Sequence, residues 1–203
     1  MGVNMSLTKQ AKVLNKSQID MVRQFLRGRR NGLRNELMFM LSVKAGLRAK
    51  EIASLKWIYL IDSDSNISDQ IHLPNIAAKG NSGRVIPINK ELGDLLKKTY
   101  DLHRSRSSFD INTSFVITTE RSKSTTAQTV VNFFQSTYQR LGLIGCSSHS
   151  GRRTFITNVA RKISTVGGSM RDVQTLAGHS SLQITQRYID LNYDAKVKVI
   201  NIL

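Results

Sequence analysis

Cysteine, proline and long apolar runs are scarce in this chain of 203 residues, which contains one cysteine and two prolines. A single cysteine excludes an internal disulfide and favours a reducing cytosol. Cys146 is therefore better explained as a small packing residue than as a nucleophile. No apolar run approaches the roughly 20 residues of a membrane-spanning helix, so we expect no membrane partner.

Acidic residues are also few, with 14 Asp and Glu against 30 Lys and Arg and a formal net charge of +16. Such an excess favours a polyanionic partner, usually nucleic acid. Residues 1–60 carry 12 basic and 3 acidic side chains, residues 61–100 carry 5 of each, and residues 101–163 carry 9 basic and 3 acidic ones. Two basic segments separated by a neutral one suit a duplex-binding cleft, whereas a generic solvated basic surface is the alternative. The acidic residues form no cluster with metal-binding spacing, so we expect neither metal nor cofactor.

Helical periodicity and turn residues predict a mainly helical α+β fold with a small antiparallel sheet on one side. Most of the apolar spacing is helical, and the 40% hydrophobic content suits a globular core. The predicted helices cover 17–27, 34–44, 91–103, 126–141, 149–163 and 170–177. The β-like segments cover 57–62, 70–77, 84–88 and 115–118, with a turn rich in glycine between the second and third.

The stretch from Cys146 to Asn192 holds an unusual set of polar residues. His149 and Arg152 are three apart at the start of a predicted helix, so they share a face near its N-terminus, where an anion is favoured. Gly178 ends the next helix, His179 lies in the link, and Tyr188 falls about two turns into a third helix. On one continuous helix His179 and Tyr188 would lie on opposite faces, so the break lets both meet one phosphate.

These residues resemble the tyrosine recombinase (phage integrase) family. His149 and Arg152 match its His-x-x-Arg box, residues 177–179 match its Leu-Gly-His box, and Tyr188 matches its nucleophilic tyrosine. Residues 45–52 look like its first arginine box, with Arg48, and residues 79–87 look like its lysine-bearing hairpin, with Lys79. The motifs follow the family order over residues 17–192. Gly151 and Ala177 stand where the family commonly has leucine.

The resemblance implies phosphoryl transfer through a tyrosine. Tyr188 would attack phosphorus, form a 3′-phosphotyrosyl link and free a 5′-hydroxyl. A guanidinium is a planar, charged donor that suits nonbridging phosphate oxygens, so Arg48 and Arg152 are the candidates to bind them. The covalent link would conserve the energy of the broken bond, so strand exchange would need neither ATP nor metal.

The remaining candidates would assist this reaction. His149 would accept a proton or orient the phosphate, and His179 would donate a hydrogen bond to a nonbridging oxygen. Lys79, at the hairpin tip, would protonate the departing 5′-oxygen, although a lysine there is ordinarily only a solvated charge. Glu51, three residues after Arg48, would brace the site through hydrogen bonds.

The resemblance thus implies a site-specific DNA recombinase or integrase, cytoplasmic and nucleoid-associated, of bacterial or phage origin. Its partners would be double-stranded DNA, further copies in a DNA-bound tetramer, and accessory DNA-bending proteins. A non-cutting DNA-binding regulator and a type IB topoisomerase-like strand relaxer are the alternatives. We expect a flexible basic segment at 1–16, a catalytic domain at 17–192, and a tail at 193–203 that packs in cis or on a neighbouring protomer. The chain could be a truncated catalytic domain or resemble the small single-domain recombinases that invert fimbrial promoter segments.

Overall fold

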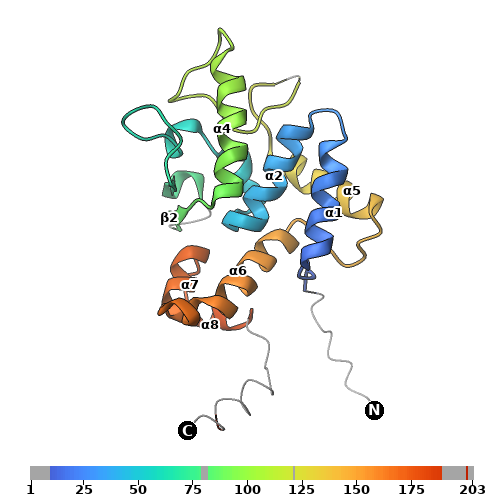
Figure 1. Ribbon diagram of the computed structural model, residues 1–203, viewed down its shortest axis with the longest axis vertical. Helices are drawn as coiled ribbons and strands as arrows, with labels where there is room; N and C mark the ends of the chain where they lie inside the picture. The colour runs from blue at the N-terminus through green and yellow to red at the C-terminus, as the bar shows by residue number, and fades with distance from the viewer. Residues whose placement is uncertain (1–9, 79–81, 121, 189–199, 201–203) are drawn as a thin grey trace.

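The fold is mainly helical and carries one small sheet (Figure 1). It is seen in a computed structural model that describes residues 10–78, 82–120, 122–188 and 200. The α-helices are α1 (Lys16–Arg27), α2 (Gly32–Ala45), α3 (Ala49–Ser54), α4 (Lys90–Arg104), α5 (Ala127–Arg140), α6 (Ser150–Lys162), α7 (Met170–Ala177) and α8 (Leu182–Gln186). The strands β1 (Gln70–Leu73) and β2 (Arg84–Pro87) pair antiparallel, with Ile71 opposite Ile86. The predicted fold class is confirmed.

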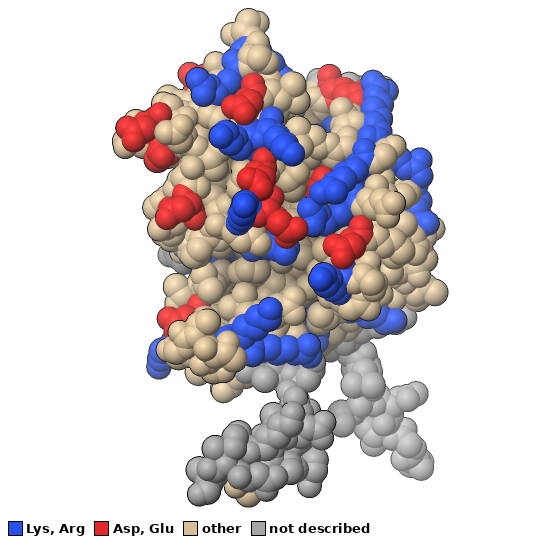
Figure 2. Space-filling view, viewed as in Figure 1, with Lys and Arg blue, Asp and Glu red and all other residues tan. Residues whose placement is uncertain are grey.

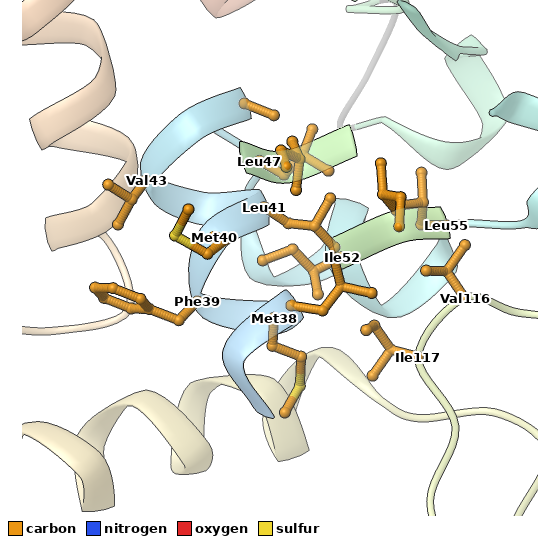
Figure 3. Close-up of a cluster of buried hydrophobic side chains, with 14 of the residues drawn as sticks. Met38, Phe39, Met40, Leu41, Val43, Leu47, Ile52, Leu55, Val116 and Ile117 are labelled. Carbon is orange, nitrogen blue, oxygen red and sulfur yellow. The ribbon is translucent and has the colours of Figure 1, made fainter. Parts of the chain in front are cut away.

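Helix α2 is buried on nearly every side and forms the centre of the main core. Leu37, Phe39, Met40 and Leu41 are all 0% exposed, and α1, α4 and α6 all pack against this helix. Figure 3 shows its apolar side chains meeting those of α3 and of the segment around Val116. A helix whose middle stretch, residues 37–43, is apolar except for Ser42 is expected in such a position. The predicted role of its methionines as core residues is confirmed.

Helices α6, α7 and α8 form a second layer beside the main body, drawn in orange and red in Figure 1. Ile156, Val173 and Ala177 form a small core of their own there. The layer meets the main body where α6 packs on α2 and where α7 packs on β2. These two contacts bring the end of α2, the start of α6 and the end of α7 together.

The contact between α2 and α6 depends on Gly151. A Cβ atom added there would lie 2.4 Å from Ser42 Oγ and 2.9 Å from Ser42 Cβ. Ser42 is itself 0% exposed, so it has no solvent to move into. A leucine at this position, which is common in the family that the sequence resembles, would force the two helices apart. Glycine in place of that leucine therefore allows α2 and α6 to pack closely.

Replacing Gly151 with alanine is accordingly expected to destabilise the protein by about 1–3 kcal/mol through overpacking. Gly93→Ala is the matched control, because that glycine lies inside α4 and its added Cβ meets only Ile88 Cγ2 at 3.6 Å. The control should gain about 0.5–1 kcal/mol from helix propensity. Chemical denaturation measures both, and equal stability of the two variants would contradict the packing argument.

Two predicted strand segments, 57–62 and 115–118, are wrong, and a third, 70–77, is strand only over Gln70–Leu73. Residues 57–62 begin with a 3-10 helix, Trp57–Tyr59, and Trp57 is 0% exposed with its indole N–H bonded to His103. Strand β1 ends at Leu73 because Pro74 has no N–H for the ladder, and a 3-10 turn over Asn75–Ala77 follows. Residues 115–118 make one isolated bridge, at Phe115. At 57–62 and 115–118 the apolar residues Trp57, Leu60, Val116 and Ile117 are buried in the core without pairing in a sheet.

Candidate active site

The C-terminal end of α7 organises a cluster of three arginines. Gly178 adopts the left-handed conformation (φ 60°) and ends the helix, which leaves its last carbonyls without helical partners. Each of three successive carbonyls instead accepts a hydrogen bond from a different arginine: Leu176 O from Arg84 Nε (2.9 Å), Ala177 O from Arg152 Nη2 (2.5 Å) and Gly178 O from Arg48 Nη2 (3.5 Å). Cations are favoured at this negative end of a helix dipole.

Arg152 joins the ends of two helices. Its Nη1 donates to Gly46 O at 2.6 Å, and Gly46 is the left-handed residue that terminates α2. The side chain is almost completely buried. Burial, with the nearby Arg48 charge, lowers the pKa of Arg152 to about 9. Two of the five guanidinium N–H groups are occupied by these carbonyls, so the others can bind an anion.

Glu51 fixes the neighbouring arginines. It is 0% exposed and accepts two hydrogen bonds from Arg84, each 3.0 Å long, and one of 2.8 Å from Arg48 Nη1. The Arg48 backbone N–H donates to it as well, at 2.8 Å. Burial alone would raise the pKa of this carboxyl, but the hydrogen bonds and charge of Arg84 keep the pKa below its ordinary value. The predicted bracing contact to Arg48 is therefore present.

Sequence reasoning missed Arg84. Its side chain is only 2% exposed and binds Glu51 in a bidentate manner. In the sequence it looked like one more basic residue after a hairpin turn. Its burial could have been inferred from the strand pattern, because Ile86, two residues on, shares its face and is buried.

The arginines and both histidines line one open cavity of about 860 Å³. His149 directly precedes α6, and it lines the cavity with Arg152, as their predicted common face requires. Ser82 and Gly83 of the hairpin line it too. Predicted site residue Lys79 lies outside the described residues, as do residues 1–9 of the predicted N-terminal segment and the tail apart from residue 200.

His179 and Tyr188 meet at the rim of this cavity. Their rings are stacked, with centroids 5.3 Å apart and 26° between the planes. The predicted break between helices is present, because α7 ends at Ala177 and α8 begins at Leu182. However, α8 ends at Gln186, so Tyr188 lies in the turn after the helix rather than within it.

The imidazole of His179 is held in one orientation by a buried hydroxyl. Nδ1 lies 3.0 Å from Oγ1 of Thr185, which is 0% exposed. Burial first, and then the charges of Arg152 and Arg48, lower the pKa of His179 to about 4. The ring is therefore neutral at pH 7. If the threonine hydroxyl donates to Nδ1, the proton resides on Nε2, which suits donation to a ligand oxygen.

Acidification from pH 6.5 to 4 is expected to destabilise the free protein. Burial lowers the pKa of His103 from 6.5 to about 4, and the pKa of His179 is also lowered to about 4. Unfolded histidines titrate near pH 6.5, so between pH 6.5 and 4 the unfolded state binds more protons than the folded state. The free energy of unfolding therefore decreases as the pH is lowered through this window. Urea denaturation at pH 7, 6 and 5 measures the slope, and His103→Gln should remove about half of the contribution that His103 and His179 make together. A stability that stays constant across this range would contradict the prediction.

The described part of the chain contains no helix with both the length and the apolar character needed to cross a membrane. Within the same residues, no group of three or more His, Cys, Asp and Glu is arranged to hold a metal ion. Cys146 is a free, half-buried thiol that packs against the main core.

Comparison with known proteins places this chain in a family. Residues 12–195 match the phage integrase family, and the chain belongs to that family. It is 27% identical over 167 residues to tyrosine recombinase XerC of Herpetosiphon aurantiacus, which covers 82% of this chain and 51% of that protein. It is 26% identical over 169 residues to XerC of Chlamydia trachomatis serovar L2, which covers 83% of this chain and 50% of the relative. The chain thus spans about half the length of these relatives.

Solved structures share the fold at low identity. The Tn1549 transposon integrase in complex with a circular intermediate DNA aligns with a TM-score of 0.73 and 18% identity over 96% of this chain and 66% of that one. The XerA recombinase crystal structure aligns with a TM-score of 0.69 and 20% identity over 93% of this chain and 62% of the other. The tyrosine recombinase catalytic fold expected from the sequence is therefore the fold observed.

Proposed function

We propose that this chain cuts and rejoins DNA strands through a covalent 3′-phosphotyrosyl intermediate on Tyr188. The observation that carries the proposal is the convergence of Arg48, Arg152, His149 and His179 with Tyr188 on one open, cationic cavity. A phosphodiester resists nucleophiles because it is an anion, so catalysis needs cations on its nonbridging oxygens, a nucleophile in line and an acid for the leaving group.

The arginines are preorganised for the first task. Arg152 is fixed by two carbonyls and Arg48 by Glu51, so neither loses much conformational freedom when phosphate binds. The buried Glu51 compensates the charge of Arg84 and directs Arg48 toward the cavity. Neutral His179 donates its Nε2 proton to a nonbridging oxygen, while Thr185 holds the other ring nitrogen.

The nucleophile and the proton carriers complete the reaction. The hydroxyl of Tyr188 attacks phosphorus, its proton passes to His149 or to water, and the P–O bond to the 5′-oxygen breaks. Lys79 protonates that leaving oxygen; Ser82 and Gly83, which follow it closely in the chain, line the cavity. Attack by a 5′-hydroxyl on the phosphotyrosine reverses the steps and rejoins a strand.

Double-stranded DNA is the proposed substrate. The net charge of +16 supports a polyanionic ligand. Figure 2 shows basic side chains gathered over α1 and the turn after it, although acidic groups are scattered across the same face. Solved structures with a similar fold include complexes with DNA, among them the Tn1549 integrase with a circular intermediate DNA and the XerH recombinase with a difH substrate. Assembly into a tetramer on DNA, help from DNA-bending proteins and a cytoplasmic, nucleoid-associated location remain parts of this proposal.

The proposal is tested with a library of nicked or half-site duplexes incubated with the purified chain. We expect a protein–DNA adduct that survives denaturing electrophoresis and leaves a free 5′-hydroxyl on the released strand. Tight DNA binding without any adduct would favour the non-cutting regulator. Adduct formation with relaxation of supercoiled plasmid, but no exchange between duplexes, would favour the topoisomerase-like alternative.

A further inference from the structure

A second cavity adjoins the first on the other side of the nucleophile. It has a volume of about 410 Å³ and shares His149, Arg152 and Tyr188 with the larger cavity. The groups that only this second cavity contacts include two further arginines, Arg153 and Arg187. The proposed reaction at the scissile phosphate uses neither of them.

Arg153 lies one residue after the buried Arg152 and therefore points about 100° further round α6. Its guanidinium lies over the ring of Tyr188, with Cζ 5.6 Å from the ring centroid. Its Nη1 donates to the side-chain oxygen of Gln10. The segment carrying Gln10 is held on this face by bonds from Lys12 N to Gly145 O and from Leu14 N to Thr154 Oγ1.

Within the described residues, no carboxylate compensates the charge of Arg153 and Arg187. Neither Arg153 nor Arg187 forms an ion pair with any carboxylate in the part of the chain that the structure describes. By contrast, Arg48 and Arg84 are both paired with Glu51. Two guanidinium groups that lack a carboxylate partner among the described residues favour an anion with several oxygens, which they can bind through forked hydrogen bonds.

We propose that Arg153 and Arg187 bind the phosphate next to the scissile phosphate on the cleaved strand. This inference rests on the proposed function. A DNA strand carries one phosphate per nucleotide, so a strand whose scissile phosphate occupies the first cavity must place its neighbours close by. The two cavities share the wall formed by His149, Arg152 and Tyr188. Arg153 then contacts both the nucleophile's ring and the neighbouring phosphate, and binding of that phosphate aligns the strand with the phenol.

The test uses nicked substrates in which one phosphate at a time, on either side of the scissile position, is replaced by a neutral methylphosphonate. The rate of adduct formation is measured for wild type, Arg153→Ala, Arg187→Ala and Arg104→Ala. Arg104 is the control because it ends α4, at the end of that helix far from α6–α8 in Figure 1. Thermal unfolding of each variant verifies that it folds.

We expect one flanking methylphosphonate to slow the wild type about tenfold or more. Arg153→Ala should slow the reaction on unmodified DNA by a similar factor and should then be almost insensitive to that same methylphosphonate. Arg104→Ala should keep the full sensitivity of the wild type. If the rate loss from Arg153→Ala and the rate loss from the methylphosphonate multiply at every flanking position, the two act independently. Arg153 then only supports the tyrosine, and the proposed phosphate site does not exist. A wild type that forms no adduct on unmodified DNA would instead refute the proposed function.

Discussion

Tyr188→Phe is expected to lower the rate of covalent adduct formation by at least about 10³-fold, with DNA affinity changed by less than about threefold. Phenylalanine keeps the ring that stacks on His179 and lies under Arg153, so only the attacking oxygen is lost. Adduct formation is measured by denaturing electrophoresis, and affinity by fluorescence anisotropy on the same nicked duplex.

Tyr138→Phe is the matched control for this prediction. Tyr138 lies in the last turn of α5; it is buried, and its hydroxyl has no hydrogen-bond partner among the described residues. Its removal should leave both adduct rate and affinity unchanged. Retention of the adduct in Tyr188→Phe would show that another residue is the nucleophile.

Glu51→Gln is expected to reduce the free energy of unfolding by about 3–5 kcal/mol, because it leaves a buried charge without its partner. The side chains of Glu51 and Arg84 are 0% and 2% exposed. Neutral glutamine would have to direct its own N–H groups at one guanidinium while accepting from the other. Urea denaturation measures the loss, and the adduct rate should also fall because Arg48 loses its orienting carboxylate.

Glu91→Gln provides the comparison. Glu91 also accepts from two cations, Arg23 at 2.7 Å and Lys44 at 2.8 Å, but its side chain is 46% exposed. Solvent screens such pairs, so the loss should stay within about 1 kcal/mol. Equal losses in the two variants would mean that burial of the Glu51 cluster contributes nothing to its strength.

Helices and the core of the fold could be predicted because their apolar spacing is regular. In the helical stripe predicted for α5, Val130, Phe134 and Tyr138 are buried and Val131 is partly buried. The segments at 57–62 and 115–118 could not be assigned correctly, since burial and strand pairing both favour apolar residues there. The ends of the helices were also hard to predict. A helix as short as α8 leaves little periodic signal in the sequence, so its end at Gln186, before Tyr188, was not predicted.

The site could be predicted where its residues follow helix starts and turns. His149 and Arg152 lie together at the beginning of α6, and the link at Gly178 turns His179 back toward Tyr188. The hydrogen bonds that hold the arginines could not be predicted. Many of their acceptors are backbone carbonyls, which every residue carries, so the sequence does not mark them. Arg84 escaped notice for this reason, as half of its contacts are with carbonyls.

The central claim is that the phenol of Tyr188 becomes joined to DNA, and mass spectrometry tests it most directly. The trapped adduct is digested with nuclease and protease, and the modified peptide is sequenced. We predict a nucleotide attached through its 3′-phosphate to Tyr188, on the peptide that contains the predicted nucleophile. A modification on any other residue, a 5′-phosphate linkage, or DNA that is bound but never covalently joined would contradict the account.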